Sequence, residues 1–295
     1  MTLPDHVTGA LREAGLDPRY VEDLVRATLE EDLAAGVDVT TEATVPATQS
    51  ARADLVAREP GVVAGLPVVE AVFAAAAGAE VAVERHAWDG DRVEAGTTVL
   101  TVHAPTRGLL IGERTALNFA CRLSGIATAT RAWADALDGT AAVVRDTRKT
   151  TPLLRPLEKY AVRVGGGENH RSSLSEAALV KDNHVIAAGG IAAAFNAVRL
   201  RFPGVPVEVE VDDVAGAVEA VEAGAELIML DNFGLDEVRE AVAAVGGRAR
   251  LEVSGGLTLD VARAYGETGV DYLSVGALTH SVVALDLALD VKSVD

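Results

Sequence analysis

Cysteine is almost absent from this chain of 295 residues. The single one, Cys121, has no partner for an intrachain disulfide, which fits a protein of a reducing compartment. No apolar run reaches the roughly 18 residues of a membrane span. The N-terminal stretch MTLPDHVTGALREAG lacks the basic and apolar regions of a secretory signal peptide. These absences predict a soluble, cytoplasmic protein.

Basic residues are also scarce: 26 Lys and Arg stand against 44 Asp and Glu, for a formal net charge of −18. Such an acidic chain has no broad basic face for a nucleic acid or an anionic membrane surface. Its 49% hydrophobic and 24% charged residues are typical of a globular protein and exclude extensive disorder. The length allows two domains or one elaborated barrel.

Two nucleotide-binding signatures are missing, and one covalent modification is excluded. Neither GxGxxG nor GxxxxGK[ST] occurs, so nothing supports a Rossmann or P-loop domain. The segment DGDRVEAG (89–96) looks like the hairpin of lipoyl and biotinyl carrier domains, but no lysine precedes Lys149. We therefore predict a plain structural turn there.

The stretch 145–171 reverses the charge of the chain. It holds seven Lys or Arg and His170 against three acidic residues, which indicates an anion site. Of the four lysines in the chain, Lys149 and Lys181 lie in or just after this stretch, which suggests that their compact ammonium groups have a specific role. Three further cations follow a four-residue spacing and are predicted to form the solvated face of a helix: Arg155, Lys159 and Arg163.

The first part of the chain predicts an α+β domain. Helical periodicity covers 18–33, and short extended segments surround an Ala-rich helix at 66–77. A further helix is expected at 109–137, with a kink or break near Gly125.

From residue 141 onward, strand and helix signals alternate, which predicts parallel strands with crossover helices. The predicted strands end at Arg145–Asp146, Lys181–Asp182, Glu210, Asp231, Ser254 and Gly276. The carboxyl ends of such strands converge on one rim, where a (β/α) barrel holds its active site. Because six units fall short of eight, we predict an incomplete, TIM-like α/β barrel.

Glycine-containing turns complete the predicted rim. Ser254, Gly255 and Gly256 lead from a strand into a helix, and the segment Val275, Gly276 and Ala277 repeats the arrangement one unit later. Backbone N–H groups at such turns bind phosphate, so together with the cations they indicate a phosphorylated substrate. The GGG run at 165–167 is expected to place His170 and Arg171 over the mouth of the barrel.

Several long motifs resemble one enzyme family. They are GERTALNFACRLSGIATAT, RDTRKTTPLLRPLEKYAVRVGGGENHR, KDNH, EVEVD, LDNF, SGG and TGVDYLSVGALTHS, which lie in the order of the nicotinate-nucleotide pyrophosphorylase (carboxylating), or quinolinate phosphoribosyltransferase, family. The resemblance covers nearly the whole chain and is densest between 112 and 281. One departure is Glu168, an acidic residue where the family pattern leads us to expect a small or apolar one.

The resemblance implies a reaction and an architecture. Quinolinate and phosphoribosyl pyrophosphate (PRPP) would give nicotinate mononucleotide, pyrophosphate and carbon dioxide in de novo NAD biosynthesis, with Mg²⁺ required. The implied architecture is an N-terminal α+β open-sandwich domain (1–117), a barrel carrying the phosphoribosyltransferase site (118–280) and a C-terminal helix (281–295) that packs back on the first domain. The resemblance also implies a homodimer, or a higher oligomer, in which Arg114 reaches the partner's site.

The resemblance assigns roles to the residues of the rim. It places quinolinate on Arg114, Thr147, Arg148, Lys149, His170, Arg171 and Lys181. The catalytic residues would be Lys149, Glu210 and Asp231, and the two carboxylates would also hold the metal and stabilise the ribose cation. The 5′-phosphate would bind at 254–256 and 275–277. Decarboxylation would need positioning and desolvation, with no covalent nucleophile.

Three other interpretations stay open at this point. Lys181 could form a Schiff base, as in phosphosugar aldolases. The same fold could act on nicotinate or another acid, and certain proteins linked to molybdenum transport resemble this family without an established place in NAD synthesis. A non-enzymatic module could bind quinolinate without turnover, although the pair Glu210 and Asp231 argues for catalysis.

Overall fold

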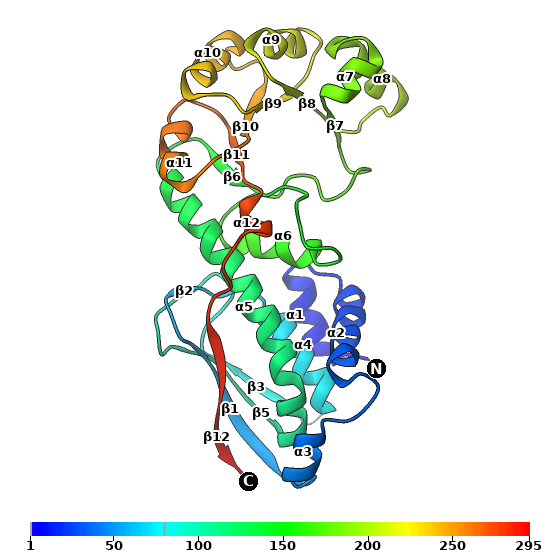
Figure 1. Cartoon of the computed structure of the whole chain (residues 1–295), viewed down its shortest axis with the longest axis vertical. Helices are drawn as coiled ribbons and strands as arrows, with labels where there is room; N and C mark the ends of the chain where they lie inside the picture. The colour runs from blue at the N-terminus through cyan, green and yellow to red at the C-terminus, as the bar shows by residue number, and fades with distance from the viewer. Residues whose placement is uncertain (1, 79–80) are drawn as a thin grey trace. The chain divides into compact units, whose positions relative to one another are not determined.

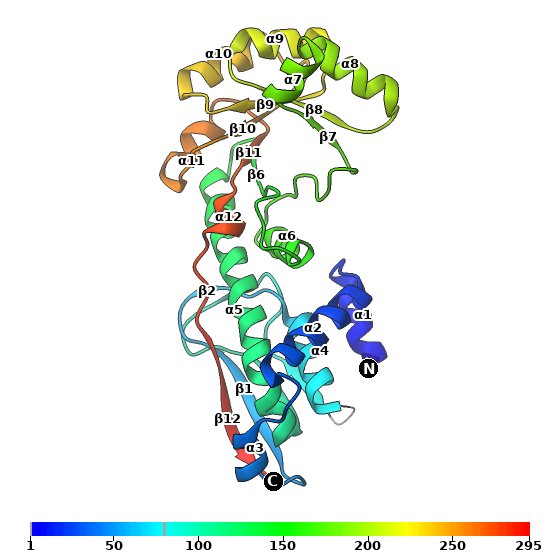
Figure 2. The same cartoon turned by 45° about the vertical axis from the view of Figure 1, so that its right-hand side comes forward.

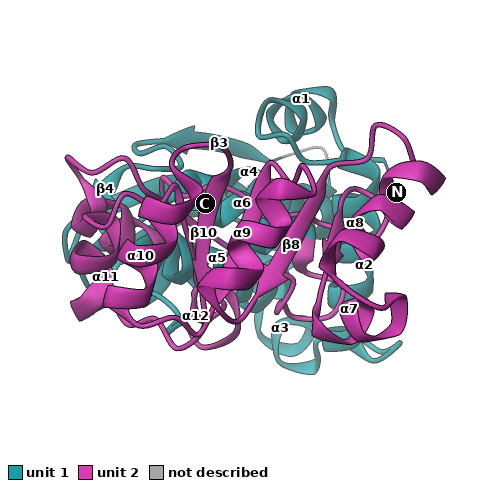
Figure 3. Ribbon diagram, turned by 90° about the horizontal axis from the view of Figure 1, so that it is seen from above, with its two compact units in different colours: residues 1–129, 156–165, 282–295 teal, residues 130–155, 166–281 magenta. Residues whose placement is uncertain are grey.

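The computed structural model describes residues 2–78 and 81–295 and divides the chain into two compact units, coloured separately in Figure 3. Unit 1 comprises residues 1–129, 156–165 and 282–295, and unit 2 comprises 130–155 and 166–281. The boundary predicted after residue 117 therefore lies too early, and the segment 156–165 belongs with the first unit.

Unit 1 contains a four-stranded antiparallel sheet in the order β12-β1-β5-β3. Its strands are β1 (Ser50–Ala57), β3 (Ala82–Arg85), β5 (Thr98–Pro105) and β12 (Leu287–Val294). The predicted C-terminal helix at 281–295 is wrong, because the end of the chain forms β12 and pairs with β1 (Figure 1). Apolar Leu287, Leu289 and Val291 alternate with Ala288, Asp290 and Lys292, the period of a strand.

The helices of unit 1 include two of the predicted ones. They are α1 (Asp5–Glu13), α2 (Pro18–Leu33), α3 (Val39–Thr44), α4 (Leu66–Ala77), most of α6 (Arg155–Val164) and the first part of α5 (Thr106–Leu137). The predicted helix at 18–33 matches α2, and the one at 66–77 matches α4. The short strand β4 (Arg92–Val93) lies within the segment 89–96 that we predicted as a turn, and it pairs with β2 (Gly61–Val62).

Gly125 does not break a helix, because α5 runs through it without interruption. A Cβ atom at this position would lie 2.2 Å from the carbonyl oxygen of Val283. The glycine therefore allows the returning chain to approach the helix closely.

The predicted solvated face of α6 is wrong for Lys159, which is 2% exposed. Every residue from Leu157 to Val162 is buried, so the middle of this helix has no face toward solvent. Arg163 is exposed as expected, whereas Arg155 is half-buried.

Unit 2 is built on a six-stranded sheet in which every pair of neighbours is parallel. Its strands are β6 (Val143–Arg145), β7 (Ala178–Val180), β8 (Val207–Val211), β9 (Leu227–Asp231), β10 (Arg250–Ser254) and β11 (Tyr272–Ser274). The order β6-β11-β10-β9-β8-β7 is that of a ring cut open between β6 and β7. The predicted incomplete α/β barrel is confirmed, and no closed barrel forms among the described residues.

Crossover helices connect these strands, and Figure 2 shows α8, α9 and α10 over one face of the sheet. The crossover helices are α7 (Asp182–Ala188), α8 (Ile191–Arg201), α9 (Val214–Glu222), α10 (Leu235–Val245) and α11 (Leu259–Gly266). The short helix α12 (Ala277–His280) follows β11, the last strand of this sheet. Among the described helices of both units, none is long and apolar enough to cross a membrane.

Candidate active site

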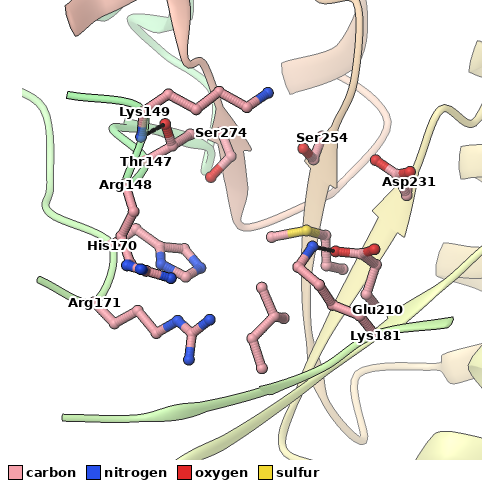
Figure 4. A pocket seen from close by; sticks show the side chains of 12 residues that line it. Thr147, Arg148, Lys149, His170, Arg171, Lys181, Glu210, Asp231, Ser254 and Ser274 are labelled. Carbon is pink, nitrogen blue, oxygen red and sulfur yellow. Dashed lines mark hydrogen bonds and ion pairs between the residues drawn. The ribbon is translucent and has the colours of Figure 1, made fainter. Parts of the chain in front are cut away.

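A pocket of about 440 Å³ opens in unit 2 where the carboxyl ends of the strands meet (Figure 4). Its lining brings together most of the side chains predicted from the sequence: Thr147, Arg148, Lys149, His170, Arg171, Lys181, Glu210, Asp231 and Ser254. Three lining residues were missed by the sequence analysis, namely Leu179, Met229 and Ser274. Leu179 and Met229 lie within the strand pattern itself, where an apolar residue gives no signal that distinguishes a pocket from a core.

Six predicted site residues are not in the lining of this pocket. Arg114 is an exposed residue of α5 in unit 1. The others belong to the two glycine-containing turns: Gly255, Gly256, Val275, Gly276 and Ala277. Their predicted roles in binding remain predictions.

One wall of the pocket is cationic and carries Arg148, His170 and Arg171 (Figure 4). Burial, together with the neighbouring charge of Arg148, lowers the pKa of Arg171 from its usual value. The Nε atoms of both arginines are buried and have no hydrogen-bond partner among the described residues. Two adjacent guanidinium groups with unsatisfied donors form a site that an anion would stabilise.

Arg155 connects the two loops that carry these arginines. Its Nη1 donates to the carbonyl oxygen of Ser172 at 2.8 Å, and its Nε donates to Oγ1 of Thr150 at 2.9 Å. A longer bond of 3.4 Å runs from Nη2 to the carbonyl oxygen of Arg148. A residue that we predicted to be solvated therefore braces the cationic wall.

The opposite wall carries carboxylates and one ammonium group (Figure 4). Lys181 Nζ forms an ion pair with Oε2 of Glu210. Oδ2 of Asp231 accepts a hydrogen bond of 2.8 Å from Nδ2 of Asn232. The anionic side chains thus face the cationic wall across the cavity, and the pocket has two chemically distinct sides.

Two glycines next to this site make room for its side chains. A Cβ atom on Gly255 would lie 2.2 Å from Oδ1 of Asn232, and the glycine has a positive φ of 98°. A Cβ atom on Gly276 would lie 2.9 Å from Cδ of Lys149. Whatever their role toward phosphate, both glycines position residues of the pocket.

His170 forms hydrogen bonds with two buried acidic residues. Its Nε2 lies 2.7 Å from Oε2 of Glu208, and its backbone N–H donates to Oδ1 of Asp146 at 2.9 Å. Glu208 was not predicted as a site residue, although its position on the strand gave a signal. Glu208 and Glu210 are two residues apart on β8, so they face the same side of the sheet.

Glu168, the departure from the family pattern, does not enter the pocket. Its backbone forms an isolated parallel bridge with Arg145, and its side chain is exposed. Its N–H donates to the carbonyl oxygen of Val144 at 2.9 Å, and its carbonyl accepts from Asp146 at 3.2 Å. The extra negative charge therefore lies on an exposed side chain outside the lining of the pocket.

Comparisons with known proteins match most of the length of this chain. The models of the quinolinate phosphoribosyl transferase N-terminal and C-terminal domains match residues 38–124 and 126–290. The nicotinate-nucleotide pyrophosphorylase [carboxylating] of Mycobacterium leprae is 51% identical over 91% of this chain and 96% of that protein. The probable nicotinate-nucleotide pyrophosphorylase [carboxylating] of Bacillus subtilis is 42% identical over 88% of this chain and 90% of that protein.

A solved structure agrees with the sequence matches. The crystal structure of NadC from Streptococcus pyogenes superposes with a TM-score of 0.90 and 42% identity, and the match covers 95% of this chain and 98% of that one. Both domain models match in the expected order, and the match to relatives extends over most of each protein. The chain therefore belongs to the quinolinate phosphoribosyltransferase family.

Proposed function

We infer that this protein transfers the phosphoribosyl group of PRPP to quinolinate with decarboxylation, giving nicotinate mononucleotide, pyrophosphate and carbon dioxide. The observation that carries this inference is the pocket itself. One wall presents two guanidinium groups and an imidazole, and the facing wall presents two carboxylates. Family membership supports the same reaction, which belongs to NAD biosynthesis.

The cationic wall suits a dicarboxylate. Each guanidinium group can bind one carboxylate through two N–H donors. Arg148 and Arg171 each have a buried donor without a described partner, so an incoming carboxylate relieves both the missing hydrogen bond and the repulsion between the two charges. Leu179 and Met229 supply apolar surface in the same lining for the face of a pyridine ring.

The opposite wall suits the sugar. Transfer of the phosphoribosyl group develops positive charge at the anomeric carbon as pyrophosphate leaves, and nearby carboxylates stabilise that charge. We assign this role to Glu210 and Asp231, which both line the pocket. In the ligand-free protein Glu210 is neutralised by Lys181, and a carboxylate of quinolinate would compete for the same ammonium group.

Mg²⁺ fits the same pair of carboxylates. This ion commonly binds proteins through one or two carboxylates together with substrate phosphates, and Glu210 and Asp231 both line the pocket. When bound, it would offset the negative charge of the pyrophosphate group. Ser254 also lines the pocket, and α11 begins five residues later at Leu259, so this turn is our proposed position for the 5′-phosphate.

Decarboxylation makes few demands on the protein. After the ring nitrogen has been glycosylated, it carries positive charge and stabilises the carbanion left by the departing carboxylate. The pocket then has to orient the ring and exclude water. The ion pair between Lys181 and Glu210 engages the lysine as a charged partner, which disfavours the alternative of a Schiff-base nucleophile.

Two further points of the proposal rest on the family resemblance, and a third rests on the sequence. We propose that the protein is a homodimer in which Arg114 completes the partner's quinolinate site. The exposed position of Arg114 on α5 is compatible with this. We also propose a cytoplasmic location, supported by the single cysteine.

A paired assay tests the reaction. Purified protein is mixed with PRPP and Mg²⁺, and either quinolinate or nicotinate is added. We expect nicotinate mononucleotide and carbon dioxide from quinolinate alone. Product from nicotinate alone would overturn the assignment of two carboxylates, and product from neither would favour a binding module.

A further inference from the structure

Behind the cationic wall, unit 2 contains a buried cluster of one imidazole and two carboxylates. It consists of His170, Glu208 on β8 and Glu252 on β10, which are 7%, 4% and 0% exposed. Of the three, His170 lines the pocket, whereas Glu208 and Glu252 do not. Buried carboxylates are costly unless they are paired, so their contacts should reveal what they do.

The two carboxylates are paired differently. Glu252 has two partners of its own, because Arg145 Nη1 donates to Oε2 at 2.5 Å and the Ser274 hydroxyl donates to Oε1. Its Oε1 lies 3.7 Å from Nε2 of His170, beyond hydrogen-bond distance. Glu252 therefore makes its direct contacts with Arg145 and Ser274 and has no hydrogen bond to the imidazole, and burial together with the charge of Glu208 raises its pKa.

Glu208 is directed at His170. Its Oε2 lies 2.7 Å from Nε2, a distance typical of a charge-assisted hydrogen bond. Its Oε1 is buried and has no hydrogen-bond partner among the described residues. The negative charge of Glu208 also acts on Arg171. It raises the pKa of the guanidinium group, although burial lowers that pKa by more. One buried anion thus faces two groups of the cationic wall from the side away from the cavity.

We propose that Glu208 is a positioning residue for quinolinate binding that acts through His170. It accepts the hydrogen of Nε2 and so fixes the plane and tautomer of the imidazole, as second-layer carboxylates do for ligating histidines. This assignment rests on the proposed function, because it takes quinolinate as the ligand of the cationic wall. It requires no contact between Glu208 and the substrate.

A double-mutant cycle tests the proposal with four proteins: wild type, Glu208→Gln, His170→Gln and the double variant. Glutamine keeps the size of Glu208 but removes its charge. We expect Glu208→Gln to raise the KM for quinolinate about tenfold, as loss of a charged hydrogen bond implies, while kcat and the KM for PRPP change less than about twofold. In the His170→Gln background the same substitution should have little further effect. Additive effects, or an unchanged KM for quinolinate, would overturn the proposal.

Glu252→Gln is the matched control, since it makes the same change at an equally buried site on another strand. Because it breaks the pair with Arg145, we expect it to lower the melting temperature while it raises the KM for quinolinate much less than Glu208→Gln. An equal rise in both variants would assign the effect to the buried charge as a whole and would contradict a specific role for Glu208.

Two further measurements keep the test decisive. If Glu208→Gln does not fold, as judged by circular dichroism, Glu208→Asp replaces it, and its shorter side chain should raise the KM for quinolinate in the same selective way. The ligand atoms of the cluster lie within 4.8 Å of one another, so metal analysis of the purified protein is included. A stoichiometric metal that is lost in Glu208→Gln would replace the positioning role by a metal site. Wild-type protein without activity on quinolinate would instead refute the proposed function.

Discussion

Arg148 and Arg171 carry the main prediction at the scale of single residues. Replacing either by alanine removes a charged, bidentate partner for one carboxylate of quinolinate. We expect the KM for quinolinate to rise roughly thirtyfold in each variant, which corresponds to about 2 kcal/mol. The KM for PRPP should change far less, because this substrate is assigned to the opposite wall.

Steady-state kinetics with each substrate varied in turn measures both values. Arg163→Ala is the control, because Arg163 is an exposed arginine of unit 1 and is not in the pocket lining. A variant at Arg148 or Arg171 with wild-type KM and kcat would show that the dicarboxylate site has been misassigned.

The sequence predicted the residues at strand ends well and those next to them less well. Lys181, Glu210, Asp231 and Ser254 were predicted because a charged or polar residue that ends an apolar strand stands out, and all four line the pocket. Gly125 was interpreted as a kink or break in a helix, and Gly255 as part of a phosphate-binding turn. The structure instead shows close approaches to Val283 and Asn232, which depend on chain segments that no local pattern connects.

At the scale of elements, Arg155 holds together two loops that come from different parts of the chain. It contacts the loop of Arg148 and Thr150 and also the carbonyl of Ser172, next to Arg171. Lysine at this position keeps the charge but cannot donate in three directions from a planar group. We expect Arg155→Lys to raise the KM for quinolinate about three- to tenfold, because both guanidinium groups lose precise placement.

The melting temperature of Arg155→Lys should change little, since the freed carbonyl groups of these loops can bind water. Kinetic assays and a thermal scan of the same preparation measure both effects, with Arg163→Lys on the same helix as the control. A large drop in melting temperature with unchanged KM would mean that Arg155 stabilises the fold and does not order the site.

Predictions of elements succeeded where one periodicity persisted over a long segment. The helix α2 was predicted to the residue, and the six strands of unit 2 were predicted because each is a short apolar or alternating segment between helical signals. The strand β12 was predicted as a helix because the family resemblance was given more weight than the alternation in LALDVKSV. The strand β1, with which β12 pairs, is far from it in the sequence. The local sequence of β12 alone therefore gave little support for predicting a strand.

At the scale of the whole molecule, the strand order of unit 2 follows from its repeated βα units. Consecutive strands from β7 to β11 are neighbours, as short connections between successive βα units favour, and β6 pairs with β11. The sequence also indicated that six strands are too few to close a barrel. It could not indicate that 156–165 would leave this unit and pack with unit 1, because that depends on tertiary contacts of α6.

The response of the whole protein to a chelator is the last prediction. Glu210 and Asp231 supply only two carboxylates, so we expect Mg²⁺ to bind firmly only together with the phosphates of PRPP. EDTA should therefore abolish activity, and added Mg²⁺ should restore it. The melting temperature of the protein without PRPP should shift by less than about 1 °C, because a weakly bound ion adds little to the stability of the folded state. With PRPP present, Mg²⁺ should raise the melting temperature, because the two then bind together to the folded protein and stabilise it.

Differential scanning fluorimetry and the activity assay, run on one sample with and without EDTA, measure these effects. Asp231→Asn should increase the Mg²⁺ concentration needed for half-maximal activity, whereas Glu168→Gln, which changes an exposed acid outside the pocket, should leave it unchanged. A fall of several degrees on adding EDTA to the protein alone would contradict this account. It would mean that the folded chain holds a resident metal, and the buried cluster of His170, Glu208 and Glu252 would then be its first candidate site.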